Sequence, residues 1–174
     1  MANNKEVFLS FRGGTRFQFT DHLYHALLRS GINTFRDDER VKSGDKLEPL
    51  LMKAIQNCKM AIVVLCEDYA SSTWCLKELV KIIECHEKHG KQVLAIIYRV
   101  KPSDVWEQKG SYEKALAILE KREDPEKVKA WRLALSKIQK WFKVEDFSKA
   151  GDELMLTRWV LCTEDICYSI VDVL

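Results

Sequence analysis

Short apolar runs alternate with longer amphipathic segments over the first hundred residues of the chain. The apolar runs are rich in β-branched and aromatic residues, and they predict strands over 7–11, 32–35, 61–65 and 93–98. The last two runs show no polar alternation, which is typical of parallel strands covered on both faces. Between the runs, apolar residues at helical spacing predict helices over 19–30, 47–58 and 74–88.

The second half of the chain follows a looser pattern. We expect a turn at 101–104, helices at 112–121 and 126–140, a short fifth strand near 141–144 and a closing helix within 154–174. Strands that alternate with helices of this length indicate an α/β fold. The specific prediction is a flavodoxin-like, doubly wound sheet of about five parallel strands with helices on both faces. In such a sheet, ligands bind beyond the carboxyl ends of the strands.

Composition and length favour one folded unit. The chain has 174 residues, of which 47% are hydrophobic and 31% are charged, and this combination excludes a disordered or fibrous chain. At about 100–200 residues per domain, we expect a single domain over 1–174 with its core over about 5–174. Lys and Arg total 28 against 26 Asp and Glu, so the charge does not favour nucleic acid as a partner. No apolar run reaches the roughly 18 residues of a membrane span, so no membrane partner is expected.

The cysteines favour a reduced, intracellular protein over a disulfide scaffold. Six of them are spread without a close CxxC pair, mostly inside apolar stretches, at Cys58, Cys66, Cys75, Cys85, Cys162 and Cys167. Cys85 lies close to His86 and His89 in the sequence. A structural zinc site needs about four ligands, and no second cluster of suitable spacing is visible. We therefore expect no metal site.

The loops after the expected strands exclude two common architectures. The loop over 12–16 contains neither the GxGxxG dinucleotide fingerprint nor the GxxxxGK[ST] phosphate loop. A receiver domain of the same architecture needs acidic residues after the first strand and an Asp at the end of the third. Phe11-Arg12 and Leu65-Cys66 occupy those places. The loop over 36–46 is long and densely charged, and its residues leave open whether it is functional or only solvated.

The helix after the third strand carries a candidate ligand-binding face. Residues at helical spacing predict its buried stripe, namely Leu76, Leu79, Val80 and Ile83. At about 100° per residue, Trp74 and Glu78 lie within about 40° of each other and about 160° from Leu76. We therefore expect them to share a face away from the core. This face is either the wall of a ligand cleft or an edge tryptophan beside a solvated glutamate.

Five stretches of the chain resemble, in order, the signatures of the plant-type TIR (Toll/interleukin-1 receptor homology) domain. They are 7–13, 34–38, 69–79, 102–112 and 131–135, and they cover nearly the whole chain. In that family the domain is the signalling head of intracellular immune receptors or stands as a TIR-only protein, and many members cleave NAD. The sequence leaves open which of the two this chain is. The resemblance implies a role in plant defence, in the cytoplasm, with the nucleus left open.

The resemblance implies an NAD glycohydrolase or ADP-ribosyl cyclase. Glu78 would be the catalytic residue, and Phe11, Arg12, Ser72 and Trp74 would form the substrate pocket. A carboxylate near the ribose stabilises the oxocarbenium-like transition state, and the departing nicotinamide needs no general acid. Capture by water gives ADP-ribose, whereas capture by an internal nucleophile gives a cyclic ADP-ribose. NAD is then the substrate, and no cofactor is implied.

The resemblance also implies that copies of the chain self-associate and that catalysis depends on this assembly. The loop over 36–46 and a neighbouring subunit would complete the pocket. Asp21 and His22 would lie in one interface and Gly110 in a second, and other TIR domains are further candidate partners. From the residues alone, His22 is equally a solvated side chain, and Gly110 is equally a helix start.

The chain departs from the family pattern at three places. Gly14-Thr15-Arg16 follows Gly13 where family members carry an acidic pair before Thr-Arg, so the first loop is shorter by about one residue. Ser43 replaces a common Arg, and Arg99 replaces a common Asp. These departures leave a second hypothesis, a catalytically weak scaffold that acts only through TIR–TIR contacts. Nucleic-acid cleavage has family precedent, but the charge balance gives it little support.

Overall fold

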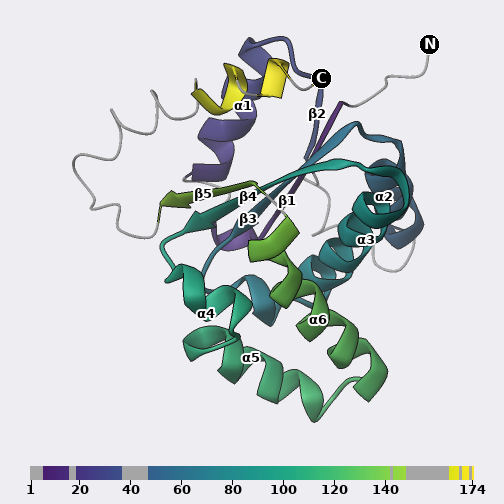
Figure 1. Cartoon of the computed structure of the whole chain (residues 1–174), viewed down its shortest axis with the longest axis vertical. Helices are drawn as coiled ribbons and strands as arrows, with labels where there is room; N and C mark the ends of the chain where they lie inside the picture. The colour runs from purple at the N-terminus through teal and green to yellow at the C-terminus, as the bar shows by residue number, and fades with distance from the viewer. Residues whose placement is uncertain are drawn as a thin grey trace.

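A five-stranded parallel sheet organises the fold. The computed structural model describes residues 6–15, 19–36, 47–141, 143–147, 165–168, 170–172 and 174. The strand order is β2-β1-β3-β4-β5, and every neighbouring pair is parallel (Figure 1). The strands are β1 (Val7–Phe11), β2 (Thr34–Arg36), β3 (Met60–Leu65), β4 (Gln92–Tyr98) and β5 (Lys143–Phe147). This order confirms the predicted flavodoxin-like α/β class.

The central strands are buried from end to end. Every residue of β1 and β3 is buried, and in β4 only Gln92 is exposed. Helices on both faces produce this pattern (Figure 1). On one side lie α1 (Asp21–Arg29) and the helical C-terminal residues 165–168 and 170–171, and on the other lie α2 (Leu47–Asn57), α3 (Thr73–His89) and α6 (Pro125–Trp141). The apolar runs in the sequence are therefore the core of the sheet.

Helix α3 has defined signals at both ends. The Ser72 hydroxyl accepts a hydrogen bond from the Cys75 backbone N–H at 3.3 Å, which caps the first turn. Gly90 follows the last turn with a φ of 65°, a left-handed conformation that glycine adopts without strain. Three basic residues in the last turn complement the negative end of the helix dipole, namely His86, Lys88 and His89. These signals fix the residues at which α3 begins and ends.

Most predicted elements are confirmed, with bounds that differ by at most three residues. The turn expected at 101–104 is wrong, because these residues open helix α4 (Pro102–Trp106). Proline favours the first turn of a helix, where its missing N–H would have no partner. Of the expected closing helix, 165–168 and 170–171 are helical, and 154–164 lie outside the described residues, as does most of the charged loop, 37–46. Among the described helices, none is long and apolar enough to cross a membrane.

Gly110 begins helix α5 (Gly110–Glu120) in a left-handed conformation that favours glycine. Its φ is 58°, and a Cβ atom placed there would lie 3.0 Å from Oδ2 of Asp104. Gly31 also has a positive φ, 78°, but a Cβ atom there would have no heavy atom within 4 Å. Gly110 therefore has a structural role within the chain, between α4 and α5, whatever it does in an interface.

Gly110→Ala should lower the free energy of unfolding by about 1–3 kcal/mol, since the left-handed backbone and the contact with Asp104 both oppose a side chain. Gly31→Ala is the matched control, because it carries the backbone strain without the contact. Urea unfolding of both variants measures the difference. Equal losses in the two variants would mean that the Asp104 contact contributes nothing.

Candidate functional site

A chain of buried hydroxyl groups holds Glu78 at the carboxyl end of the sheet. Ser10 lies near the end of β1, Tyr69 in the short helix η4 (Tyr69–Ser71) and Glu78 in the second turn of α3. The Ser10 hydroxyl donates to Oε2 of Glu78 at 2.6 Å, and its oxygen lies 3.0 Å from the Tyr69 hydroxyl. All three side chains are completely buried. These hydrogen bonds place the Glu78 carboxylate near the carboxyl end of β1, at the edge of the sheet where this fold class binds ligands.

Cys75 joins the surrounding elements. Its carbonyl oxygen accepts a hydrogen bond from the Tyr69 hydroxyl at 3.0 Å. Its backbone N–H donates to Ser72, and its thiol donates to the carbonyl oxygen of Phe11 at 3.5 Å. The first turn of α3 is therefore tied both to η4 and to the last residue of β1. Of the predicted pocket residues, Phe11, Ser72 and Glu78 are brought together in this way.

The expectation that Glu78 lies on a face away from the core is wrong. Glu78 is 0% exposed, and Cys75, Ile82 and Cys85 are buried with it. These four residues recur at helical spacing and form a buried stripe that includes the Ser10 contact with β1. Of the stripe that the sequence pattern identified, Leu76, Leu79 and Ile83 are also buried, whereas Val80 is only half-buried and lines the groove between α2, α3 and α6. Because α3 packs against α2 and α6 as well as the sheet, its buried arc is wider than a single stripe.

Tyr112 and Cys66 are two further buried groups close to Tyr69 and Cys75. Tyr112 of α5 is completely buried, and its hydroxyl donates to the carbonyl oxygen of Cys66, just beyond β3, at 2.9 Å. Burial raises the pKa of Tyr69 and Tyr112 well above 10, and it raises the pKa of the Cys66 thiol to about 11. These three groups therefore keep their protons at neutral pH.

Trp74 is half-buried at the edge of this site, packed against the core. The Lys77 ammonium lies 5.2 Å from the centre of its ring, within the range of a cation–π contact. The same ammonium lies 3.2 Å from a carboxylate oxygen of Glu48 in α2. Lys77 therefore links Trp74 to helix α2. The resemblance assigns Trp74 to the pocket, and α2 follows the loop over 37–46.

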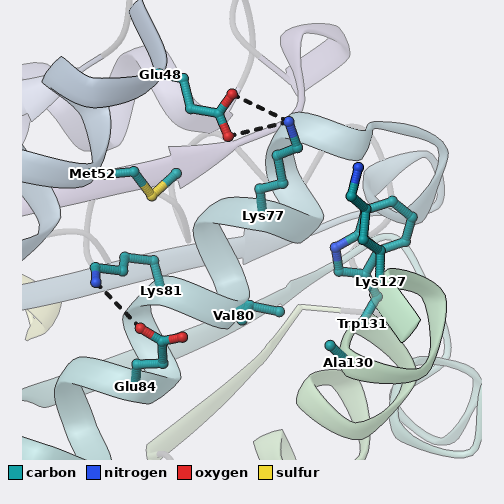
Figure 2. A pocket seen from close by; sticks show the side chains of 9 residues that line it. All are labelled: Glu48, Met52, Lys77, Val80, Lys81, Glu84, Lys127, Ala130 and Trp131. Atoms are coloured by element: carbon teal, nitrogen blue, oxygen red, sulfur yellow. Dashed lines mark hydrogen bonds and ion pairs between the residues drawn. The ribbon is translucent and has the colours of Figure 1, made fainter. Parts of the chain in front are cut away.

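An open groove of about 340 Å³ lies between α2, α3 and α6. Figure 2 shows Lys77 reaching from α3 to Glu48, and Lys81 beside Glu84 on the same helix. The lining residues are Glu48, Met52, Lys77, Val80, Lys81, Glu84, Lys127, Ala130 and Trp131. Glu78 is not among them, so this groove is a different place from the cleft that the sequence predicts beside Glu78.

Residues 12–15, just after β1, form a turn closed by its own hydrogen bonds. The Arg12 carbonyl oxygen accepts from the backbone N–H and the hydroxyl of Thr15, at 3.0 and 2.9 Å. The Thr15 hydroxyl lies 2.7 Å from that of Thr20, which precedes α1. The side chain of Arg12 is half-buried. Gly13–Thr15 forms the single turn η1.

Asp21 is engaged within the chain. Its carboxylate accepts a hydrogen bond from the Arg36 guanidinium at 2.6 Å, and this bond holds the pKa of Asp21 below its ordinary value. The guanidinium also lies 4.1 Å above the ring of Tyr24. Asp21 therefore ties α1 to the end of β2. His22 beside it is exposed.

Cys85 and His86 are both engaged in packing or hydrogen bonding within the fold. Cys85 is buried, and Nδ1 of His86 lies 2.7 Å from the carbonyl oxygen of Lys91. Within the part of the chain that the structure describes, no three metal-ligating side chains lie together. Five cysteines fall in that part, and all five are buried free thiols. Cys162 and Ser43 lie outside it.

Comparison with known proteins identifies the family. A sequence model described as the TIR domain matches residues 6–158. The chain belongs to the TIR domain family. It is 47% identical over 145 residues to disease resistance protein RPV1 of Vitis rotundifolia, covering 81% of this chain and 10% of that protein. It is 48% identical over 134 residues to TMV resistance protein N of Nicotiana glutinosa, covering 75% and 12%. The chain thus spans about a tenth of the length of these relatives.

Solved TIR domains share the fold. The TIR domains in the structure of the activated Roq1 resistosome directly recognizing the pathogen effector XopQ match with a TM-score of 0.82 and 42% identity, over 95% of this chain and 99% of that chain. The RPS4 and RRS1 TIR domain heterodimer matches with a TM-score of 0.56 and 20% identity, over 97% and 96%, and this likeness concerns the fold alone.

Sequence reasoning missed three residues of the site in this TIR domain, namely Ser10, Tyr69 and Cys75. Ser10 had a readable signal, because it is the one polar residue in the expected strand over 7–11. A buried hydroxyl in an apolar strand needs a hydrogen-bond partner from elsewhere in the fold. Tyr69 and Cys75 carried no such signal, since an aromatic ring and a thiol are ordinary core residues.

Ser72→Ala should lower the free energy of unfolding by about 1 kcal/mol, because the first turn of α3 loses its cap. Ser72→Asp should keep most of the stability, since aspartate is an equally good N-cap residue. Urea unfolding of the two variants separates the capping role from any contact with substrate. If Ser72→Asp is as unstable as Ser72→Ala, the hydroxyl is needed for something other than the cap.

Proposed function

We propose that this TIR domain is a plant immune signalling domain that self-associates and hydrolyses NAD to nicotinamide and ADP-ribose or a cyclic ADP-ribose. The observation that carries the proposal is the position of the Glu78 carboxylate, which Ser10 holds at the carboxyl end of the sheet. The similarity to disease resistance proteins supports the role in immunity. We place the activity in the cytoplasm, with the nucleus left open.

The chemistry assigns one task to each group. Cleavage of the nicotinamide N-glycosidic bond develops positive charge on the ribose, and the Glu78 carboxylate stabilises that charge. Nicotinamide leaves as a neutral molecule, so the reaction needs no second carboxylic acid beside Glu78. Trp74 at the edge of the site supplies an apolar wall for the substrate, and Phe11 and Arg12 supply the facing loop.

The burial of Glu78 supports a dependence of activity on assembly. A carboxylate that is 0% exposed cannot touch NAD until the groups that cover it move. We propose that contact between copies supplies this change, as expected of a domain that is 42% identical to the TIR domains of a resistosome. The specific activity should therefore rise with protein concentration instead of staying constant.

Glu78→Gln should reduce nicotinamide release from NAD about a hundredfold or more, since the amide is close in shape but cannot balance the charge of the transition state. Glu84→Gln is the matched control, because Glu84 lies on the same helix and lines the groove instead. Chromatography of nicotinamide at high protein concentration gives the rates. Equal rates in the wild type and Glu78→Gln would contradict the assignment.

The second candidate function is a scaffold that acts only through TIR–TIR contacts, and the complete burial of Glu78 is the observation that favours it. It predicts self-association without nicotinamide release at any concentration. The two candidates are separated by the same assay when it is combined with light scattering of the same sample.

His22→Glu should weaken self-association several-fold, because it places a negative charge at an exposed position of α1. His89→Glu is the control, since His89 is exposed at the far end of α3. Light scattering over a concentration series measures both. Association that is unchanged in His22→Glu would place the interface elsewhere.

A further inference from the structure

The ring of Trp74 is contacted by a charged residue of its own helix. Trp74 and Lys77 are three residues apart on α3, so their side chains are neighbours on the helix surface. The Lys77 ammonium lies over the Trp74 ring, 5.2 Å from its centre. A cation at this distance is attracted to the negative face of the ring. The tryptophan side chain therefore has two supports, the ammonium over its ring and the core against which it packs.

The Lys77 ammonium is itself held from α2. It lies 3.2 Å and 3.3 Å from the two carboxylate oxygens of Glu48 (Figure 2). Glu48 lies in the first turn of α2, where the positive end of the helix dipole favours a carboxylate. A lysine side chain has a flexible stem, and its strongly hydrated ammonium otherwise extends into water. Glu48 therefore fixes the ammonium at the place where it meets the ring.

A second lysine of α3 shows what distinguishes Lys77. Lys81 lines the same groove, but its ammonium lies 3.2 Å from Glu84 of its own helix. The ion pair of Lys77 crosses instead to α2, which packs against α3. Of these two ion pairs, the one that bridges two helices is also the one that contacts an aromatic ring.

We propose that Lys77 is a positioning residue for Trp74, through which Glu48 of α2 holds the ring in place at the edge of the site. The inference rests on the proposed function only for what the ring does there, which is to form a wall of the NAD pocket. Trp74 precedes Glu78 by four residues, about one helical turn, so the two side chains are neighbours on α3. The position of the ring then determines the room beside the carboxylate, and Lys77 acts without touching NAD.

Substitutions on either side of the ion pair should have the same kinetic effect. Lys77→Met keeps an apolar stem without the charge, and Glu48→Gln keeps the lysine without its anchor. Each should raise KM for NAD about two- to fivefold with little change in kcat, which corresponds to one exposed cation–π contact. The double variant should be no worse than either single variant, because both act through the same contact. Lys77→Arg should stay close to the wild type, since a guanidinium keeps the ion pair and also stacks on aromatic rings.

The position of the ring is measured without enzyme activity, by fluorine NMR of the full chain labelled with 5-fluorotryptophan. The Trp74 signal is the one that disappears in Trp74→Phe. Glu48→Gln should shift this signal, whereas Glu84→Gln, the matched control that breaks the ion pair within α3, should leave it in place. In the Lys77→Met background, Glu48→Gln should cause no further shift. A signal that stays in place in Glu48→Gln, or that moves equally in both backgrounds, overturns the proposal.

The kinetics separate positioning from direct binding of NAD by Lys77. If the ammonium bound the phosphates of NAD, Lys77→Met would raise KM, but Glu48→Gln would free the ammonium and would not raise it. That outcome overturns the proposal. A wild type that releases no nicotinamide overturns the proposed function and leaves the fluorine result standing. A Trp74 signal that shifts in Glu48→Gln while KM keeps its wild-type value overturns the link between the ring and the substrate.

Discussion

A carboxylate inside an apolar core needs a hydrogen-bond donor, and in this TIR domain that constraint joins strand β1 to helix α3. Removing such a group from water costs several kcal/mol when it is unpaired. The Ser10 hydroxyl meets this requirement at 2.6 Å. Because β1 pairs with both β2 and β3, the direction of the Ser10 side chain is fixed by the sheet. The hydrogen bond from Ser10 in turn orients the Glu78 carboxylate. The position of Glu78 is therefore set by the sheet as much as by its own helix.

Helix α3 is the element on which the site and the opposite surface both depend. One side of it carries Glu78 to β1, and another carries Lys77 to Glu48 of α2. Its first turn is held by the Ser72 cap and by the three hydrogen bonds of Cys75. A displacement of α3 along the sheet would break the bond of Glu78 to Ser10 and the bonds of Cys75 to Tyr69 and Phe11. This is why a helix with so many polar contacts at one end is also a rigid part of the fold.

The sequence predicts the sheet far better than the site. The apolar runs over 61–65 and 93–98, which lie in β3 and β4, are typical of parallel strands covered on both faces. This pattern predicted the fold class. The face of Glu78 was misplaced because periodicity finds one stripe, whereas α3 is covered on more than one side. The pairing of Ser10 with Glu78 joins residues 68 positions apart, and no local pattern encodes such a contact. Helix α4 was missed because proline is common both in turns and in the first turn of a helix. The sequence around Pro102 does not distinguish the two, and the packing of the folded chain does.

The ties of α3 restrict how Glu78 can become accessible on the proposed function. Moving the helix would uncover the carboxylate but would also separate it from Ser10 and so destroy its orientation. Moving what covers the site leaves the hydrogen bond intact, and the carboxylate then meets its substrate already oriented. Preorganised charge of this kind stabilises a transition state without reorganisation at the moment of reaction. The tight bonding of α3 to β1 therefore favours an activation step in which the cover moves and the catalytic helix stays in place.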